Sequence, residues 1–376
     1  MDAYIFDQDL NSIAIIDTYK SFIWTDRYLG CGDFEIYIPA TTKMLDVLKK
    51  DNYLSVEESD RTMVIESIEL EENAEDGDYL IVTGRSLESL LERRIIWGQK
   101  VLHGNFQSAI KELLNENAIS PTNQNRKIPR ITFRDSDNAS ITALTVDTQF
   151  FGDNLYEAVY ALCKEKDVGF KIVQTDAGAF EFSLYLGTDR SYAQEVNPWV
   201  VFSLSLENLL TSNYLESDKT LRTVSMAAGE GEGSSRRLVE VQGSDTGTFG
   251  LSRRELYTDA SDISATHEVE QTVTDPNTGK ATTETVEQKF TDEEYDAQLT
   301  SKGKEDLATH LKTKTFESEI DATRQFVYGR DFTIGDIVQI VSKYGMESVS
   351  RVSEVVHSHS PSDSSITPTF TAMDGS

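Results

Sequence analysis

The 376-residue chain has few of the residues that mark several large classes of protein. Its two cysteines, Cys31 and Cys163, are far apart and lack a metal-ligand spacing. This excludes a disulfide framework and is typical of a protein made in a reducing cytoplasm. No run of about 18 apolar residues is present, so we expect no transmembrane helix and no stable membrane insertion. The first residues, MDAYIFDQDL, are acidic and lack an apolar segment, so we expect no signal peptide.

Basic residues are scarce relative to acidic ones. The chain has 35 lysines and arginines against 64 aspartates and glutamates, which gives a formal net charge of −29. Such a surface repels the phosphates of nucleic acids and the headgroups of anionic lipids, and the sequence has no basic stripe. The charge therefore argues against specific DNA binding. Two interpretations remain: an ordinary soluble acidic surface, which composition favours, or a surface past which a polyanion moves without binding.

Residues for catalysis or metal binding are sparse as well. The only histidines close together are His357 and His359, which would share one face of a strand, with Asp363 nearby. We favour a solvated strand end over a metal site there. The HExxH, GxSxG and Walker patterns are absent, and GEGEG (residues 229–233) lacks the lysine and hydroxyl of a phosphate loop. We expect no catalytic, cofactor-binding or metal-binding residue and no enzymatic activity.

The chain has enough apolar material for several domains. Hydrophobic residues make up 38% of it, and its length predicts roughly two to four domains. Residues 1–96 contain short apolar runs, such as residues 4–6 and 13–16 on either side of the turn DLNS, and the alternating strand FEIYIP. Short strands with turns at close spacing are typical of a barrel or sandwich. We therefore predict a first tube β-barrel domain over residues 1–96.

Residues 97–205 are predicted to form a small α+β domain. NFQSAIKELLNEN has one apolar helical face behind Asn105 as the N-terminal cap. DNLYEAVYALCKEKDVG repeats the arrangement, with Asp153 as the cap and Gly169 as the glycine that ends the helix. Its inward face includes Cys163, which we interpret as a core residue and not a nucleophile. The strands FKIVQT and AFEFSLYLG follow as a hairpin.

Residues 251–325 are predicted to form an inserted domain of a hairpin and a helix. The hairpin, residues 266–290, surrounds the turn DPNTG. Its strands carry few apolar side chains, so we expect it to project toward solvent or another chain. The helix opens with a capping box formed by Thr291 and Glu294. Its apolar stripe consists of Tyr295, Leu299, Leu307 and Leu311.

Two segments near the ends of the chain repeat one pattern. A shift of 284 positions places Leu54 on Val338 and Ile65 on Val349, and the register holds through the intervening turn without a gap. Sequence identity between the segments is low, so chance similarity is the alternative explanation.

The same shift places Asp51-Asn52 on Gly335-Asp336, in the segment DFTIGDIVQI. Glycine, asparagine and aspartate tolerate left-handed backbone angles, so both segments would lead into a strand through the same kind of turn. The repeat predicts that residues 206–250 together with residues 326–376 form a second tube β-barrel domain. Residues 251–325 would then be an insertion in it.

These features together resemble phage baseplate hub proteins. That family includes the siphophage tail-tip hub, the N-terminal part of tail-associated lysins and the hub of contractile tails. The resemblance rests at the start of the chain on RYLGCGDFEIYIP, NYLSVEE, TMVIESIE and YLIVTGRSLESLLERRII, and at its end on FTIGDIVQI, SVSRVSEVVHS and TPTF. It covers roughly the first 95 and the last 50 residues, and the middle by organisation only.

The resemblance implies a mainly β fold in which two similar tube-forming barrel domains lie beside two smaller domains. It also implies a homotrimer, whose pseudo-sixfold ring would join the hexameric tail tube to a threefold tip. The protein would belong to the tail tip of the virion, be assembled in the host cytoplasm, and meet the distal tail or tube ring, the tape-measure protein and tip or fibre proteins. DNA would pass without specific binding through an acidic lumen, for which Glu57-Glu58 and residues 229–233 are candidates.

Two other functions stay open. A tail-associated cell-wall hydrolase would need a catalytic cluster in residues 97–205 or 251–325, and we expect no peptidase or glycosidase domain after TPTFTAMDGS. A receptor-binding tail protein would need an exposed aromatic groove, whereas Trp24, Trp97 and Trp199 are scattered and lie in apolar runs. We therefore predict a structural hub.

Overall fold

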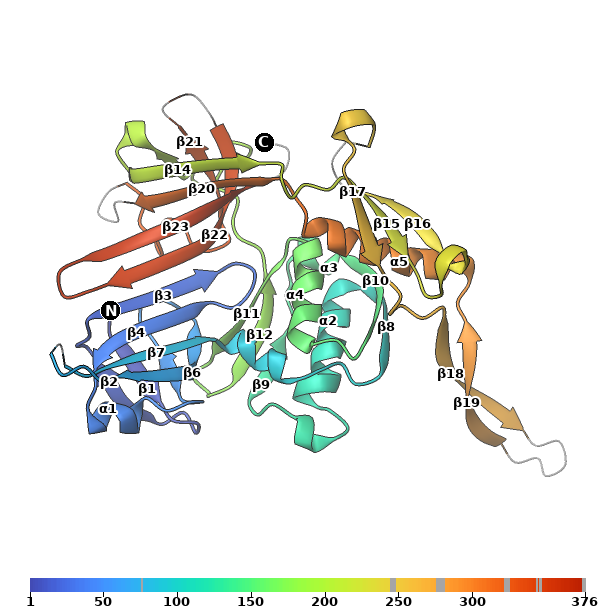
Figure 1. Ribbon diagram of the computed structural model, residues 1–376, viewed down its shortest axis with the longest axis horizontal. Coiled ribbons are helices and arrows are strands. Elements are labelled where there is room, and N and C mark those ends of the chain that lie inside the picture. Colours follow the sequence, from blue (N-terminus) through green and yellow to red (C-terminus); the bar gives the residue numbers. More distant parts are fainter. Residues whose placement is uncertain are drawn as a thin grey trace.

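The computed structural model describes residues 1–373 except residues 76, 244–247, 275–280, 321–324, 343, 345 and 346. Within these residues the fold is mainly β with α+β insertions, as predicted, and comprises a 13-stranded sheet and four smaller sheets. Figure 1 shows two β-units stacked at one end, a helix-containing unit in the middle and a further helix-containing unit from which a hairpin extends. Among the described residues, no helix is both long and apolar enough to cross a membrane.

The first β-unit, called here the N-terminal β-unit, contains seven strands and one short helix. Apolar residues alternate along its strands, as in the eight residues from Tyr79, where every second residue is buried, because successive side chains of a strand point to opposite faces. The inward-facing set forms one core around Phe22, Trp24 and Phe34. The apolar runs at residues 4–6 and 13–16 lie in two strands that pair antiparallel across the turn DLNS. The elements are β1 (Ala3–Phe6), β2 (Ser12–Ile16), β3 (Ser21–Arg27), β4 (Asp33–Pro39), α1 (Thr42–Val47), β5 (Tyr53–Ser55), β6 (Thr62–Glu71) and β7 (Tyr79–Ser86).

The second β-unit, called the C-terminal β-unit, is assembled from segments far apart in the chain. Its core contains Phe202, Phe332, Val352 and Phe370. Antiparallel pairing joins strands from before and after residues 224–308 into one sheet. The elements are β13 (Val201–Ser203), η4 (Leu204–Leu206), β14 (Leu209–Ser217), β20 (Thr313–Ile320), β21 (Ile337–Val341), β22 (Glu347–His359) and β23 (Ser364–Ala372).

The α+β unit lies between them in the chain and has the largest core, to which Cys163 belongs, as predicted. Its first long helix begins as predicted, because the Asn105 side chain accepts a hydrogen bond from the Ser108 amide at 3.0 Å. The predicted hairpin is confirmed by pairing of its two last strands. The elements are η1 (Leu87–Arg93), β8 (Gln99–Asn105), α2 (Phe106–Leu114), η2 (Asn115–Ile119), η3 (Gln124–Arg126), β9 (Ile131–Arg134), α3 (Ala139–Thr142), β10 (Thr145–Phe151), α4 (Leu155–Glu165), β11 (Gly169–Gln174) and β12 (Phe180–Tyr185).

Both predicted ends of α4 are wrong by a small distance. Asn154, not Asp153, is the cap, since its side chain accepts from the amides of residues 156 and 157 at 3.0 and 3.3 Å. The left-handed residue after the helix is Asp167, with φ 52°. Gly169 lies in β11, where a Cβ atom would come within 2.5 Å of the Tyr28 ring. Close packing, and not helix termination, therefore requires glycine at this position.

The remaining elements form a unit around the long helix α5, called the α5 unit. The predicted capping box is confirmed: Thr291 Oγ1 accepts from the Glu294 amide at 3.2 Å, and Glu294 accepts from the Thr291 amide at 2.8 Å. Of the predicted stripe, Tyr295, Leu299 and Leu307 are buried, whereas Leu311 lies beyond the helix and is exposed. The elements are β15 (Val224–Ala228), η5 (Gly233–Ser235), β16 (Leu238–Gln242), η6 (Gly250–Ser252), β17 (Glu255–Asp259) and α5 (Asp292–Ala308).

The strands of the middle of the chain are grouped differently from the prediction. Of the strands in residues 206–250, only β14 joins the C-terminal β-unit, while β15 lies between β16 and β17 in a separate sheet. Conversely β20, inside the predicted insertion, joins the C-terminal β-unit. The reason is that the apolar stripe of α5 needs an apolar surface, which Ala227 and Val241 supply. That these units are separate domains stays a prediction.

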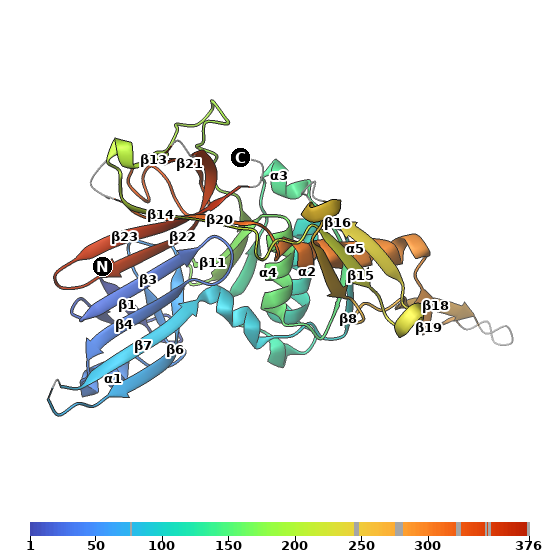
Figure 2. The same ribbon diagram turned by 45° about the horizontal axis from the view of Figure 1, so that its top comes forward.

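The predicted hairpin is formed by β18 (Thr266–Thr274) and β19 (Ala281–Lys289), which pair antiparallel over their whole length. Figures 1 and 2 show it extending away from the α5 unit. The turn DPNTG at its tip lies outside the described residues.

Gly303 in α5 gives a test of the packing between this helix and its sheet. A Cβ atom at this position would lie 2.7 Å from Cγ2 of Val241. At an open helix position, Gly→Ala stabilises by about 1 kcal/mol. Here we expect Gly303→Ala to lower the melting temperature, because the methyl group overlaps Val241.

The matched control is a double-mutant cycle with Val241→Ala. In that background the space is free, so the added Gly303→Ala should raise the melting temperature above that of the Val241→Ala variant. A Gly303→Ala protein more stable than the unmodified protein would show that the helix does not pack as described.

Candidate assembly interface

The two β-units are joined by main-chain hydrogen bonding between β3 and β22. The strands are antiparallel, with Arg27 opposite Glu354 and Phe22 opposite His359. The contact continues beyond the strand end, where the Tyr28 amide donates to the Ser353 carbonyl at 3.0 Å. In Figures 1 and 2 the paired strands lie side by side across the boundary between the units. This pairing, called the seam below, makes one continuous sheet from two halves of the chain.

Side chains reinforce the seam at both ends. Arg27 Nε donates to Glu354 Oε2 at 2.7 Å, and Arg27 Nη1 donates to the carbonyl of Cys31 at 2.8 Å. At the other end, the Tyr19 hydroxyl and His359 Nδ1 are 2.8 Å apart. The seam therefore has polar contacts at its ends and buried residues such as Trp24 and Val355 between them.

The segment DFTIGDIVQI and its predicted counterpart have the same backbone geometry. Asp51 has φ 65° and Gly335 has φ 90°, both left-handed. The Asp51 amide donates to Ile65 and the Ile65 amide donates to Asn52, both at 2.9 Å.

At the other end of the chain the pattern is identical. The Gly335 amide donates to Val352, and the Val352 amide donates to Asp336, both at 2.8 Å. The Asp336 carboxylate also accepts from the amides of Thr188 and Thr333, at 2.7 and 3.0 Å. The predicted equivalence of these two turns is therefore supported by matching hydrogen bonds.

The predicted register holds in β5 and β21, where Leu54 and Val338 occupy equivalent positions, but it is wrong after the hairpin turn that follows. Val352 plays the part of Ile65, an offset of 287 and not 284, so Val349 is not its counterpart. The hairpin from Ile337 to its partner Arg351 is three residues longer than that from Tyr53 to its partner Val64. Three inserted residues cannot be seen in a low-identity comparison, whereas the hydrogen bonds fix them.

The repeat extends over five strands. β6 has a bulge between Ile65 and Ser67, and β22 has one at the equivalent place, between Val352 and Glu354. The sheet order β3-β4-β7-β6-β5 matches β14-β20-β23-β22-β21. The correspondence stops there, since β1 runs antiparallel to β5 but β13 runs parallel to β21.

The repeat leaves two strand edges without the partner that their counterparts have. β22 pairs on one side with β21 through residues 347–351 and with β3 through residues 354–359. β6 pairs on the equivalent side with β5 through residues 62–64, and in the described structure no strand lies beside residues 67–71 on that side. Likewise β14, the counterpart of β3, pairs only with β20 among the described strands. An unpaired edge is a template for pairing with another chain.

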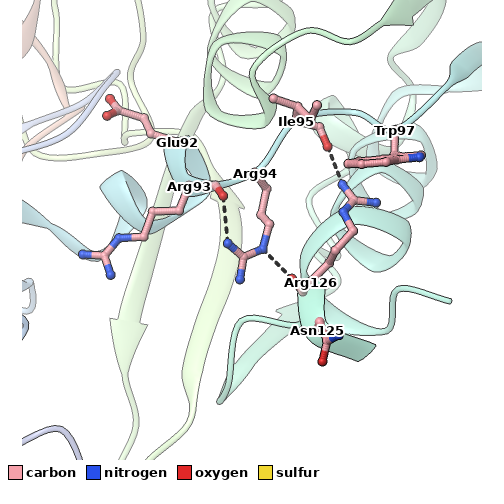
Figure 3. A pocket seen from close by; sticks show the side chains of 7 residues that line it. All are labelled: Glu92, Arg93, Arg94, Ile95, Trp97, Asn125 and Arg126. Atoms are coloured by element: carbon pink, nitrogen blue, oxygen red, sulfur yellow. Dashed lines mark hydrogen bonds between the residues drawn. The ribbon is translucent and has the colours of Figure 1, made fainter. Parts of the chain in front are cut away.

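The sequence also placed its three tryptophans in apolar runs, and only one of them is buried. Trp24 is fully buried in the N-terminal β-unit, whereas Trp97 and Trp199 are 72% and 51% exposed. Trp199 packs edge-on against Tyr192. Trp97 lies at the rim of a recess on the α+β unit, under the guanidinium group of Arg126 (Figure 3). Periodicity within a short apolar run does not separate a core residue from a surface one.

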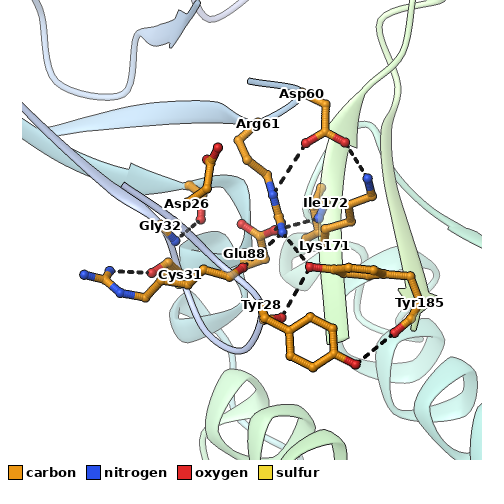
Figure 4. Close-up of polar contacts among 12 residues, drawn as sticks. Asp26, Tyr28, Cys31, Gly32, Asp60, Arg61, Glu88, Lys171, Ile172 and Tyr185 are labelled. Carbon is orange, nitrogen blue, oxygen red and sulfur yellow. Dashed lines mark hydrogen bonds and ion pairs between the residues drawn. The ribbon is translucent and has the colours of Figure 1, made fainter. Parts of the chain in front are cut away.

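A buried ion pair fixes the α+β unit against the N-terminal β-unit. Arg61 donates to Glu88, and the side chains of both are almost fully buried. Glu88 Oε1 also accepts from the Ile172 amide at 2.8 Å, and Arg61 Nη2 lies 3.3 Å from the Tyr185 hydroxyl. Figure 4 shows these groups converging between the two units. Removing one partner of such a pair costs about 3–5 kcal/mol, because the other charge stays buried.

A second charged contact ties the C-terminal β-unit to this junction. Arg351 Nη2 donates to Asp167 Oδ2 at 2.6 Å, and Arg351 Nη1 donates to the Gly335 carbonyl at 2.8 Å. Its guanidinium group stacks on the Tyr28 ring, 4.3 Å from the ring centroid. Tyr28 directly follows β3, so one aromatic residue meets all three units near the seam.

The histidines weighed as metal ligands have other surroundings. Among the described residues no group of three or more histidine, cysteine, aspartate or glutamate side chains could hold a metal ion. His359 contacts Tyr19, but His357 is buried, at 7% exposure, so the interpretation of a solvated strand end is wrong for it. Both cysteines are buried as well, and burial raises the pKa of Cys31 to about 12. Neither thiol is activated as a nucleophile.

His357 faces Asp26 across the seam. Burial lowers the pKa of His357, an effect that the charges of Asp26 and Glu58 partly oppose. Burial also raises the pKa of Asp26, which accepts from Ser59 Oγ at 2.9 Å and from Trp24 Nε1 at 3.0 Å. The seam thus contains a histidine whose charged form is disfavoured by burial.

The other residues singled out in the sequence do not converge on one site. Glu57 and Glu58 are exposed on the N-terminal β-unit, where Glu57 accepts from the Tyr4 hydroxyl at 2.8 Å. Residues 229–233 connect β15 to β16 on the α5 unit. The strand edges, in contrast, were not found from sequence, because only the pairing of all strands shows which edge is unused.

Comparison with known proteins gives a match over almost the whole chain. Residues 2–370 match the family described as Siphovirus ReqiPepy6 Gp37-like protein. No match is found among curated proteins.

Solved structures share the fold. The tail protein from Neisseria meningitidis MC58 has a TM-score of 0.57 at 14% identity, covering 99% of this chain and 96% of that one. Prophage tail protein gp18 from Listeria monocytogenes EGD-e has a TM-score of 0.56 at 10% identity, covering 100% and 96%. The 43 kDa tail protein of prophage MuSo2 from Shewanella oneidensis has a TM-score of 0.56 at 10% identity, covering 98% of each chain.

His357 gives a test of the seam through pH. Because its pKa is lowered on folding, the unfolded chain binds a proton that the folded chain does not, and stability falls as the pH drops below the ordinary histidine value of about 6.5. Asp26, with its raised pKa, contributes with the opposite sign. We expect the free energy of unfolding to fall less between pH 7.5 and pH 5.5 for the His357→Phe variant than for the unmodified protein. Urea unfolding at each pH measures this.

His103→Phe is the matched control, since His103 is exposed. It should not reduce the acid sensitivity of the protein, because it removes an exposed side chain beside Asp147 and no buried imidazole. Equal acid sensitivity of the His357→Phe variant and the unmodified protein would mean that His357 is not held neutral at the seam.

Proposed function

This chain belongs to the family of Siphovirus ReqiPepy6 Gp37-like proteins, and we propose that it is a structural hub of a phage tail tip in which three copies form a ring. The observation that carries the proposal is the seam together with the two unused edges. Each chain contains one complete seam, between β3 and β22, and the separate halves of an equivalent one, on β14 and β6.

We propose that β6 of one copy pairs with β14 of the next, as β22 pairs with β3 within a chain. The strand equivalences give the register. Glu354 corresponds to Ser67, and Arg27 corresponds to Ser217 through the ladders of β4 and β20. Since Arg27 lies opposite Glu354, Ser67 of one copy would lie opposite Ser217 of its neighbour. Two residues further on, Glu69 would face Leu215.

An interface of this kind joins two different surfaces, so it generates a closed ring when the rotation between copies permits. With two similar units in each chain, three copies would give six similar units and alternate internal seams with intermolecular ones. This supports a homotrimer with pseudo-sixfold symmetry, able to join a hexameric tail tube to a threefold tip.

The net charge of −29 supports a passage through which DNA moves without specific binding, because carboxylates repel phosphates within a Debye length of about 8 Å. Of the acidic segments considered, Glu57 and Glu58 lie on a β-unit, whereas residues 229–233 lie on the α5 unit. We therefore favour Glu57 and Glu58 as lumen residues. Neighbours in the assembly would be the distal tail or tube ring, the tape-measure protein and tip or fibre proteins.

The role proposed is structural and not enzymatic. In its support, both cysteines are buried and so are not placed as exposed nucleophiles. The protein would be assembled in the host cytoplasm and remain in the tail tip of the virion.

Cysteine cross-linking tests the ring and its register together. In the variant Glu69→Cys with Leu215→Cys, both cysteines are at exposed positions, and opposed strand residues are close enough for a disulfide. Oxidation of the trimer should give a covalent species of three chains on a non-reducing gel. The native cysteines Cys31 and Cys163 are buried and should not react.

The matched control is Glu69→Cys with Glu216→Cys, in which the second cysteine points to the other face of β14. It should give little cross-linked product. A protein that stays monomeric at the concentrations found in assembled tails would contradict the proposed ring. A trimer that cross-links only in the control variant would contradict the proposed strand register and leave the ring in place.

A further inference from the structure

We propose that the recess between residues 92–97 and 125–126 on the α+β unit binds an acidic segment of another protein, with carboxylates on Arg94 and Arg126 and an apolar side chain on Trp97. The recess has a volume of about 320 Å³. It lies outside the seam and the two unused edges, so this inference does not depend on ring formation.

The two arginines are held in place by neutral groups only. Arg94 donates to the carbonyls of Arg93 at 2.7 Å and Lys127 at 3.3 Å, and also to the carbonyl of Arg126. Arg126 Nη2 in turn donates to the carbonyl of Ile95 at 2.5 Å and to Asn117 Oδ1 at 3.0 Å. In the described part of the chain, neither arginine forms an ion pair with a carboxylate. Both guanidinium groups are thus positioned in advance, and no carboxylate of the described residues pairs with them.

The other charged side chains that line the recess do not neutralise them. Glu92 also lines the recess, but its carboxylate is held by Arg85 at 2.7 and 2.8 Å. Figure 3 shows it pointing away from Arg94 and Arg126. Arg93 is paired with Asp51 at 2.7 Å. Burial and the charges of Arg126 and Arg93 lower the pKa of Arg94, so the site is electrostatically strained by like charges that an anion would relieve.

The recess is flanked by exposed apolar side chains. The Arg126 guanidinium lies 5.0 Å from the centroid of the Trp97 ring, and the ring remains 72% exposed. Phe151 and Ile95 are exposed as well, and they are brought near Trp97 by main-chain bonding of residues 95–96 to residues 152–154. Tryptophan and arginine are over-represented among the residues that contribute most to binding at protein interfaces.

These features fit an acidic peptide better than a nucleic acid. A nucleic acid gains affinity from many phosphate contacts, but the recess offers two unneutralised guanidinium groups in a chain of net charge −29, whose field repels a polyanion. A short segment with two carboxylates around an apolar residue needs only two cations. It would form planar two-point contacts, which suit guanidinium groups, and would cover Trp97.

The test uses the full chain and the peptide acetyl-Glu-Glu-Phe-Glu-Glu-amide, followed by tryptophan fluorescence and calorimetry at low salt. We expect saturable binding that weakens as salt is added. Arg94→Gln and Arg126→Gln should each weaken it about tenfold or more, as hydrogen bonds to charged groups do. Arg134→Gln is the matched control on the same unit, because Arg134 is exposed and paired with Glu181; it should bind as the unmodified protein does. Trp97→Phe should abolish the fluorescence change.

Because Arg94 and Arg126 also hold loops, Arg126→Lys is added, with thermal unfolding of each variant. Lysine keeps the charge but not the planar fork, so a folded Arg126→Lys protein should bind more tightly than Arg126→Gln. Equal binding of the matched glutamine peptide, or unchanged binding in both arginine variants, would overturn the proposal. Displacement of the peptide by an equimolar single-stranded hexanucleotide would assign the recess to nucleic acid instead.

Discussion

Main-chain pairing between β3 and β22 is the interaction on which the rest of this structure depends. It joins the start of the chain to its end and converts two repeats into one sheet. The chain between the repeats must leave this sheet and rejoin it without interrupting the pairing of β3 with β22. Accordingly, β20 returns to the C-terminal β-unit after the α5 unit. Buried backbone groups need partners, and the seam supplies them for one pair of edges. The same requirement has no answer within the described strands at the second edge of β14 and beside residues 67–71 of β6.

The side chains around the seam explain why it has one geometry. Strand pairing alone permits slippage. The left-handed turns at Asp51 and Gly335 fix where β5 and β21 begin, and the equivalent bulges in β6 and β22 fix the twist of the strands that follow. The buried Arg61–Glu88 pair then sets the α+β unit against the N-terminal β-unit. A buried ion pair is weak evidence for stability, so we interpret this one as a device that specifies position.

Predictions from the sequence were correct where the structural feature depends on residues that are close together in the chain. The caps at Asn105 and Thr291, with Glu294, were predicted correctly because a cap depends on residues within one turn of helix. The turn at Gly335 was predicted for the same kind of reason, and the family match confirms the resemblance to phage tail proteins. The error at Asp153 is also local, because adjacent Asp-Asn residues can both cap. The error at Gly169 is not local, because this glycine is required by the ring of Tyr28, which is distant in the chain.

The sequence by itself determined that the chain is mainly β, because apolar and polar residues alternate along its strands. It also determined that two segments lead into a strand through the same turn, because their residues tolerate left-handed backbone angles. That one helix begins at a capping box follows from hydrogen bonds between near neighbours in the chain. Only the tertiary structure decided that β15 and β16 pack on α5, that the offset of the repeat rises from 284 to 287 after the hairpin turn, that His357 is buried, and that β6 and β14 keep an unused edge. These depend on which strands meet and which side chains fill the same space, and such contacts between distant residues leave no periodic pattern in the chain.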